Sequence, residues 1–190
     1  MYVLARTLIF IAMLSGSPML LAQASPTATR ALDIQVGGGF TTLNPDSQPT
    51  RFNGGAAYFD VNFKAHLGVE GEFHFATDAG GSGRYEKTYE IGGRYFRTYG
   101  RLIPYAKAMY GRGVYNFTVI TANSPASGPY TYVTVANLAY NLAAGGIGVD
   151  YELLQHVNLR ADWEYQNWFG FQNSSLTPSI LTIGGAYRFR

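Results

Sequence analysis

The chain has 190 residues, no cysteine and a formal net charge of +2. The lack of cysteine excludes a disulfide framework, so stability has to come from the fold itself. The 14 basic and 12 acidic side chains nearly balance, which gives no electrostatic reason to expect nucleic acid as a partner. No segment beyond the N-terminus approaches the ~18 consecutive apolar residues of a membrane helix.

The N-terminus reads as a secretory signal. Arg6 supplies a positive charge, residues 7–14 form a short apolar run, and Ala22-Gln23-Ala24 gives a small-x-small cleavage pattern. A membrane anchor is the alternative, but the apolar run is too short to span a bilayer. We therefore predict a cleaved signal peptide at 1–24, a short polar lead at 25–30 and a single domain at 31–190.

Within that domain, eight segments alternate between apolar and polar residues, the period of a β-strand with two different faces. In chain order, the predicted strands are 31–40, 55–64, 67–76, 84–98, 103–117, 133–152, 157–166 and 179–189. The pattern is clearest in 157–166, where Val, Leu, Ala, Trp and Tyr alternate with Asn, Arg, Asp, Glu and Gln. Ten such residues suit a tilted strand that crosses ~25 Å of hydrocarbon.

The connections between these strands alternate in length. Long loops rich in Gly, Pro, Asn or Ser are expected at 41–54, 77–84, 119–132 and 168–178. Short turns are expected at 65–66, 99–101 and 153–156. Short turns on one side and longer loops on the other are typical of bacterial outer-membrane barrels, which have even strand numbers from eight upward. We predict an all-β fold: a closed eight-stranded antiparallel up-and-down transmembrane β-barrel, with short periplasmic turns and longer extracellular loops.

The chain resembles the family of the transmembrane domain of outer membrane protein A and its small single-domain relatives. The resemblance covers residues 31–190 and rests most on 157–166 and on the final segment 181–189. In that family a last strand that ends in an aromatic residue is the signal for the barrel-assembly machinery, which implies this role for Tyr187 and Phe189. Arg190 follows that aromatic residue and departs from the pattern, and the peptidoglycan-binding domain of the longer relatives is missing. The resemblance implies a protein of the outer membrane, in contact with its lipid.

Charged residues share the face that a membrane barrel turns inward. An eight-stranded barrel has an interior that side chains fill, so buried charges there must pair. Ten acids and five bases have this parity, so some acids should lie at watery rims or carry protons. The predicted lumen network consists of Asp33, Asp60, Lys64, Glu70, Glu72, Glu86, Glu90, Arg94, Lys107, Asp150, Glu152, Arg160, Asp162, Glu164 and Arg188.

An enzymatic reading rests on His74, which shares a face with Glu70 and Glu72. Some eight-stranded outer-membrane barrels hydrolyse lipid A with a His-x-Ser pair that faces the lipid. In this chain the corresponding serine is missing, and His74 has the inward parity. No metal-ligand spacing surrounds the histidines, and Gly37-Gly38-Gly39 lies inside a strand with no following helix. We therefore expect no catalytic, cofactor-binding or metal-binding residues and no cofactor.

A soluble ligand-binding barrel is a further alternative, because alternation alone permits charged residues outside and an apolar interior. The alternation of long loops with short turns, and the last strand that ends in an aromatic residue, favour the membrane barrel instead. We expect a monomeric, non-catalytic outer-membrane protein with a structural or surface-contact role, including adhesion. Its loops 41–54, 77–84, 119–132 and 168–178 would meet an unknown extracellular partner, and no nucleic acid is expected. A narrow or transient pore is the alternative function.

Overall fold

The computed structural model describes residues 32–46, 49–121, 131–170 and 175–189. The predicted signal peptide at 1–24 and the polar lead at 25–30 lie outside the described residues, as does Arg190. In the part of the chain that is described, no helix is long and apolar enough to cross a membrane.

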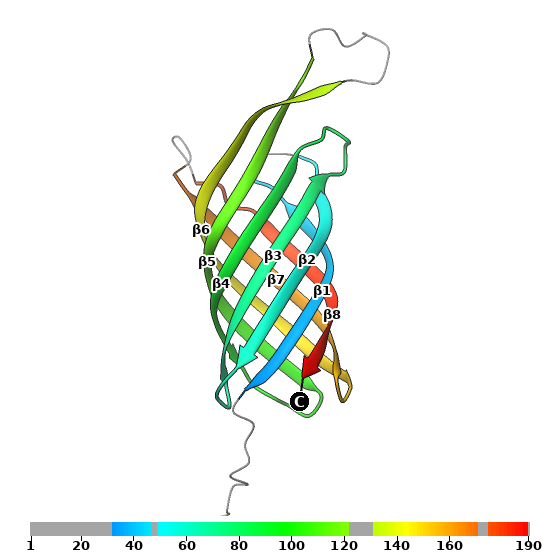
Figure 1. Cartoon of the computed structure of the whole chain (residues 1–190), viewed down its shortest axis with the longest axis vertical. Coiled ribbons are helices and arrows are strands. Elements are labelled where there is room, and N and C mark those ends of the chain that lie inside the picture. The colour runs from blue at the N-terminus through cyan, green and yellow to red at the C-terminus, as the bar shows by residue number, and fades with distance from the viewer. Residues whose placement is uncertain (1–31, 47–48, 122–130, 171–174, 190) are drawn as a thin grey trace, which may run out of the picture. The chain divides into compact units, whose positions relative to one another are not determined.

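Eight antiparallel strands form one closed barrel in which each strand pairs with its neighbours in sequence and β1 pairs with β8 (Figure 1). The strands are β1 (Asp33–Asn44), β2 (Phe52–Asn62), β3 (Leu67–Asp78), β4 (Tyr85–Phe96), β5 (Leu102–Ile120), β6 (Tyr132–Leu154), β7 (Val157–Phe169) and β8 (Ser179–Phe189). The predicted all-β barrel with eight up-and-down strands is confirmed. Closure pairs the backbone groups around the ring, which is what a sheet in hydrocarbon requires.

The connections at one end of the barrel are short. The β2–β3 turn is held by the Phe63 and Lys64 amides, which both donate to the Leu67 carbonyl at 3.2 Å. In the β4–β5 turn, Gly100 has a φ of 62°, a left-handed conformation that glycine adopts without a steric penalty. By the rule that short turns face the periplasm, this end is the periplasmic one.

Several predicted strand ends were wrong, with the larger differences at the extracellular side. β1, β2, β3 and β7 run further into the segments 41–54, 77–84 and 168–178 than expected, and β5 and β6 take both ends of 119–132. The alternation persists in these parts, but threonine, asparagine and tyrosine made it less visible in the sequence. For example, Thr41 and Leu43 are buried inward and pair directly with Thr182 and Ile180 across the β1–β8 seam.

Lys64 is a second correction. The sequence placed Lys64 in the lumen as the last residue of the second strand, but β2 ends at Asn62. Lys64 lies in the turn and is exposed. The Phe63–Leu67 turn takes its residues out of the strand alternation, so the inward parity no longer applies there.

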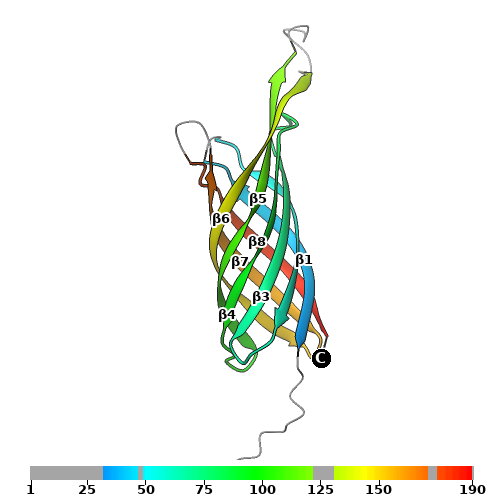
Figure 2. The ribbon, with the colours of Figure 1, turned by 60° about the vertical axis from the view of Figure 1, so that its left-hand side comes forward.

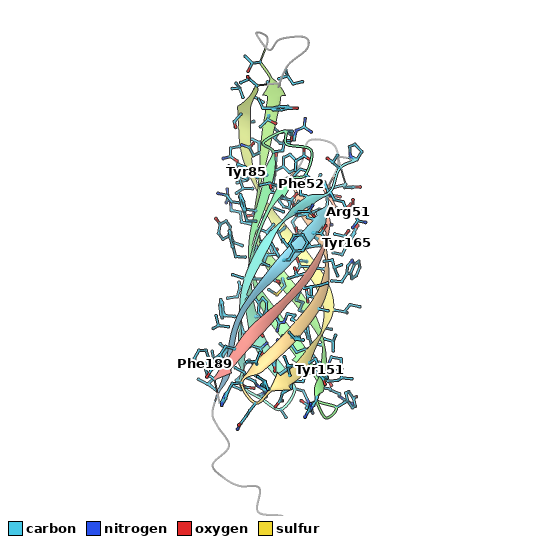
Figure 3. The ribbon with its side chains drawn as sticks, turned by 90° about the vertical axis from the view of Figure 1, so that its right-hand side faces the viewer. Arg51, Phe52, Tyr85, Tyr151, Tyr165 and Phe189 are labelled. Carbon is cyan, nitrogen blue, oxygen red and sulfur yellow. The ribbon has the colours of Figure 1, made fainter. Side chains whose placement is uncertain are left out.

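The outer wall is apolar and the inner wall is polar, the reverse of a soluble barrel. Ile91, Ile147 and Ile183 face outward and are 58%, 59% and 61% exposed, although they lie in the middle of paired strands. Aromatic side chains mark both ends of this wall, with Tyr85 and Tyr165 toward the loop end and Tyr151 and Phe189 toward the turn end (Figure 3). Tyr151, Tyr165 and Phe189 are exposed, and Tyr85 is half-buried. This is the arrangement of a barrel surrounded by lipid and bounded by aromatic girdles, and it excludes the soluble ligand-binding alternative.

The two longest strands continue beyond the barrel. β5 has its last partner on β4 at Tyr115, which pairs with Glu86, and β6 has its last partner on β7 at Asn141, which pairs with Phe169. Beyond these points, as far as Ile120 and Tyr132, β5 and β6 pair with each other and with no other described strand. Figures 1 and 2 show this pair rising as a narrow hairpin above the other six strands.

Candidate functional site in the barrel interior

The interior is filled by side chains in successive levels from the periplasmic to the extracellular end. At the periplasmic rim, the Arg188 guanidinium binds Asp33, with Nε 2.8 Å from both carboxylate oxygens. Its Nη1 lies 3.7 Å from Glu152. All three side chains remain partly exposed, so this rim group is in contact with water.

The next level is an arginine cluster that consists of Arg94, Arg160, Asp60, Asp150 and Glu70. Arg160 Nε lies 2.8 Å from Asp150 Oδ1, and its Nη2 lies 2.6 Å from Asp60 Oδ2. Arg94 Nη1 shares that Asp60 oxygen at 2.6 Å, and its Nη2 binds Asp150. The two arginines therefore bridge β2, β4, β6 and β7 across the barrel axis.

Aromatic rings and amides complete the arginine cluster. The Arg94 guanidinium lies 3.8 Å from the Tyr105 ring centre, and the Arg160 guanidinium lies 3.9 Å from the Tyr58 ring centre. Such cation–π contacts are strongest where the groups are desolvated, as they are here. Gln35 donates to Asp60 at 2.8 Å and accepts from Asn158 at 2.7 Å.

Above the arginines lies a lysine cluster centred on Lys107. Its ammonium group lies 3.3 Å from Glu70, 2.9 Å from Asp162 and 3.0 Å from Glu164, and it also binds Glu72. Tyr105 donates its hydroxyl hydrogen to Asp162 at 2.6 Å. Lys107 is fully buried, so this one cation offsets charge from four carboxylates on two strands, β3 and β7.

His74 and Gln166 occupy the level above Lys107. His74 Nε2 lies 3.1 Å from Glu72, and its Nδ1 lies 3.2 Å from the Thr88 hydroxyl. Gln166 donates to both Glu90 at 2.6 Å and Glu164 at 2.8 Å. Its carbonyl oxygen accepts from the Trp168 indole N–H at 2.8 Å.

The extracellular end of the lumen is closed by an apolar plug. The indole of Trp168 lies against Gly113, where an added Cβ would collide with the ring. Trp168 also pairs with Leu176 from the loop that follows β7. The plug consists of Leu43, Phe52, Ala76, Met109, Tyr115, Leu142, Ala144, Trp168, Leu176 and Ile180. Together with the charged levels below, it fills the barrel.

Acids outnumber cations inside. Eight carboxylates are fully buried, against Arg94, Lys107, Arg160 and the imidazole of His74. Glu86 is the extreme case, because neither of its oxygens has a hydrogen-bond partner among the described residues. Since an unpaired buried charge is costly, the excess carboxyl groups must hold protons or bind a cation.

Two groups of buried side chains could hold a metal ion. His74, Glu90 and Glu164 offer ligand atoms within 4.8 Å of one another, as do Glu72, Asp162 and Glu164. Lys107 already lies among the second group. Sequence spacing did not reveal the first group because its members come from β3, β4 and β7.

The structure brings most of the predicted lumen residues together. Asp33, Glu152 and Arg188 lie at the periplasmic rim, and Lys64 is outside. The fully buried members are Asp60, Glu70, Glu72, Glu86, Glu90, Arg94, Lys107, Asp150, Arg160, Asp162 and Glu164. Tyr187 and Phe189 face outward at the end of β8, with edge-to-face rings 5.0 Å apart. Their role as an assembly signal stays a prediction.

The sequence reading missed the neutral parts of this interior. Tyr58 and Tyr105 contact the arginines, and Trp168 had been placed in a loop. The alternation of inward and outward residues along β7 could have identified Trp168 as an interior residue. Continuing the inward positions of β7 past Glu164 leads to Gln166 and then to Trp168, where the inner wall changes from charged to apolar.

Comparison with known proteins agrees with this geometry. The family model of the outer membrane protein beta-barrel domain matches residues 9–189. The chain belongs to this outer-membrane β-barrel family. It is therefore an outer-membrane barrel protein by family as well as by fold. A comparison with curated protein sequences gave no match.

Solved structures of small outer-membrane barrels are similar to this outer-membrane barrel. Neisserial surface protein A has a TM-score of 0.59 at 13% identity, over 84% of this chain and 98% of that one. The outer membrane protein OprG from Pseudomonas aeruginosa has a TM-score of 0.56 at 16% identity, and the match covers 85% of this chain and 97% of OprG. Ail, the attachment invasion locus protein of Yersinia pestis, has a TM-score of 0.52 at 16% identity in its complex with a heparin analogue. This match covers 83% of this chain and 97% of Ail. Such low identities show the shared fold alone.

Proposed function

We propose that this barrel is a non-catalytic, non-conducting outer-membrane protein that makes surface contacts through the projecting β5–β6 hairpin. The observation that carries the proposal is the hairpin itself. Beyond Tyr115 and Asn141, its two strands have no ladder partner on β4 or β7 among the described residues, so each presents an outer edge of backbone donors and acceptors. Such an edge is a template on which an extended strand of another polypeptide can pair.

The composition of the hairpin supports this role. No charged residue occurs between Arg112 and Asp150. Natural proteins often place charged side chains, especially lysine, on exposed edge strands, because these charges hinder pairing with another chain. In this hairpin Val119, Val133 and Val135 are instead about half exposed, at 49%, 49% and 58%. An uncharged, β-branched edge favours contact with extended, weakly charged polypeptide segments.

The interior supports the non-conducting and non-catalytic parts of the proposal. The arginine cluster, the lysine cluster and the apolar plug fill the lumen along its length. His74 is 1% exposed and binds Glu72 and Thr88, so it cannot reach a lipid on the outer wall. A contact role also agrees with the similarity to Ail, an attachment invasion locus protein whose structure was solved with a heparin analogue.

The test is adhesion of cells that display the protein to immobilised proteins of the cell surface and extracellular matrix. Val135→Lys adds a charge at an outward position of the projecting hairpin and should reduce adhesion strongly. Asn53→Lys is the matched control, since Asn53 is exposed at the same end but lies on β2, which is paired on both sides. Equal adhesion by the two variants, at equal surface levels, would contradict the proposal.

A further inference from the structure

Charge is sorted across the barrel wall. Of the twelve acidic residues, ten lie on the interior side. The other two lie at the extracellular end, Asp46 in the β1–β2 connection and Asp78 at the last position of β3. The outward positions of the described strands carry no charged side chain, with two exceptions. Those exceptions are Lys87 on β4 and Arg112 on β5. The outward face of the described strands therefore carries positive charge only.

Lys87 and Arg112 are neighbours. Arg112 pairs with Tyr89, and Lys87 pairs with Val114, so the two cations are diagonal partners on the same face of adjacent strands. Diagonal partners lie roughly 7–8 Å apart, which is within reach of long side chains that converge on one group. In the described part of the chain, neither residue forms an ion pair with a carboxylate, and Lys87 lies over the Tyr85 ring at 5.8 Å.

The height of Lys87 and Arg112 above the periplasmic end of the barrel follows from their positions along β4 and β5. Arg112 lies ten residues after Leu102, the periplasmic start of β5, and Lys87 lies nine residues from Phe96, the periplasmic end of β4. With a rise of ~3.4 Å per residue and a strand tilt of ~35–45°, Arg112 lies roughly 24–28 Å above the periplasmic end. The apolar band of such barrels is ~25 Å tall, so both cations lie at its extracellular boundary.

We infer that Lys87 and Arg112 form a binding site for a phosphate-bearing lipid headgroup of the outer leaflet. Lipid-facing cations are costly at the bilayer centre and tolerated near the interface, where a phosphate can pair with them. Arg supplies a planar fork that binds phosphate oxygens in pairs, and Lys supplies a point charge beside it. With no carboxylate on this face, an anion there has no competitor within the protein.

The site can be tested on the purified, refolded protein in neutral detergent micelles. The probes are bisphosphorylated lipid A, the same lipid with both phosphates removed, and inorganic phosphate, with lipid adducts measured by native mass spectrometry. The test variant is Lys87→Gln/Arg112→Gln. The control is Arg97→Gln/Arg101→Gln, which removes two cations from the exposed periplasmic turn. Unchanged gel mobility before boiling shows that both variants fold.

The bisphosphorylated lipid should bind at least about tenfold more tightly than the phosphate-free lipid, the ratio that one net charge-assisted hydrogen bond provides. That preference should disappear in Lys87→Gln/Arg112→Gln, persist in the control and weaken with added salt. The inference is overturned by equal binding of the two lipids, or by an equal loss in both variants. It is also overturned if inorganic phosphate alone binds as tightly as the lipid, because the site would then select a free anion.

Discussion

At the scale of single residues, the interior depends on cations that each serve several acids. Arg160 is 2% exposed, binds Asp150 and Asp60 within 2.8 Å, and stacks on Tyr58. Its removal leaves two buried carboxylates with fewer partners, and breaking a buried pair in this way costs about 3–5 kcal/mol. Arg160→Ala should therefore lower the urea midpoint clearly.

Arg51→Ala is the control for Arg160→Ala, because Arg51 is exposed in the β1–β2 connection. An exposed arginine contributes little, typically about 0–1 kcal/mol. Equal urea midpoints for the two variants would show that Arg160 is not a buried counter-ion.

Glu86 should behave in the opposite way. It is 1% exposed, both its oxygens lack hydrogen-bond partners among the described residues, and its strand neighbours are Ala76 and Tyr115. An unsatisfied buried polar group costs about 1–3 kcal/mol, so Glu86→Leu should leave the urea midpoint unchanged or raise it. A clear fall in the midpoint would mean that Glu86 has a partner, such as a bound cation, in the folded protein.

At the scale of elements, the sequence and the structure agree where the alternation is strong. β8 was predicted with its observed bounds, Ser179–Phe189, and β7 with its observed start. Charged or amide side chains alternate with apolar ones in β7, and large apolar residues alternate with polar or small ones in most of β8. Lys64 was misplaced because nothing in the sequence shows where β2 gives way to its turn. The extracellular strand ends were missed because Thr, Asn and Tyr suit both a strand and a loop.

Contacts across the lumen could not be predicted from the sequence. Inward parity identified the charged residues of the arginine cluster. Their partners depend on how the closed ring is staggered, which local patterns do not encode. Asp60 on β2 meets Arg94 on β4 and Arg160 on β7, and none of these strands pairs with another of the three. Arg160 and Asp150 are the exception, since the β6–β7 turn brings them directly opposite each other.

The β5–β6 hairpin should be the least protected part of the sheet. Among the described residues, its projecting segments 116–120 and 132–137 pair with each other and with no further strand, and the register shift between Phe117 and Thr118 leaves Val135 without a ladder partner. Central barrel residues such as Ala106 pair with two strands. Amide hydrogen exchange reports this local stability. We expect exchange in the projecting part to be faster than at Lys107 or Arg160 by orders of magnitude. Similar protection throughout β5 would indicate that the hairpin is covered, for instance by a second copy of the protein.

At the scale of the whole molecule, closure makes unfolding cooperative, because opening any seam leaves backbone groups unpaired in an apolar surrounding. The detergent-extracted protein should therefore migrate differently on gels before and after boiling. Circular dichroism of the unboiled sample should be dominated by strand. Identical migration, or a spectrum poor in strand, would contradict the closed barrel.

The central claim is that the lumen is filled and the outer wall carries the function. Bulky residues block the interior at several levels, and even the inward-facing Gly148 has no free space, since an added Cβ would collide with the Tyr105 ring. Barrels need about 16 strands before an aqueous channel remains. Planar-bilayer recordings of the purified, refolded protein test this claim most directly. We predict no stable conductance, at most brief leaks as the ion pairs rearrange. Uniform, long-lived conductance steps in most insertions, abolished by Gly148→Phe, would show an open pore and contradict the filled-barrel account.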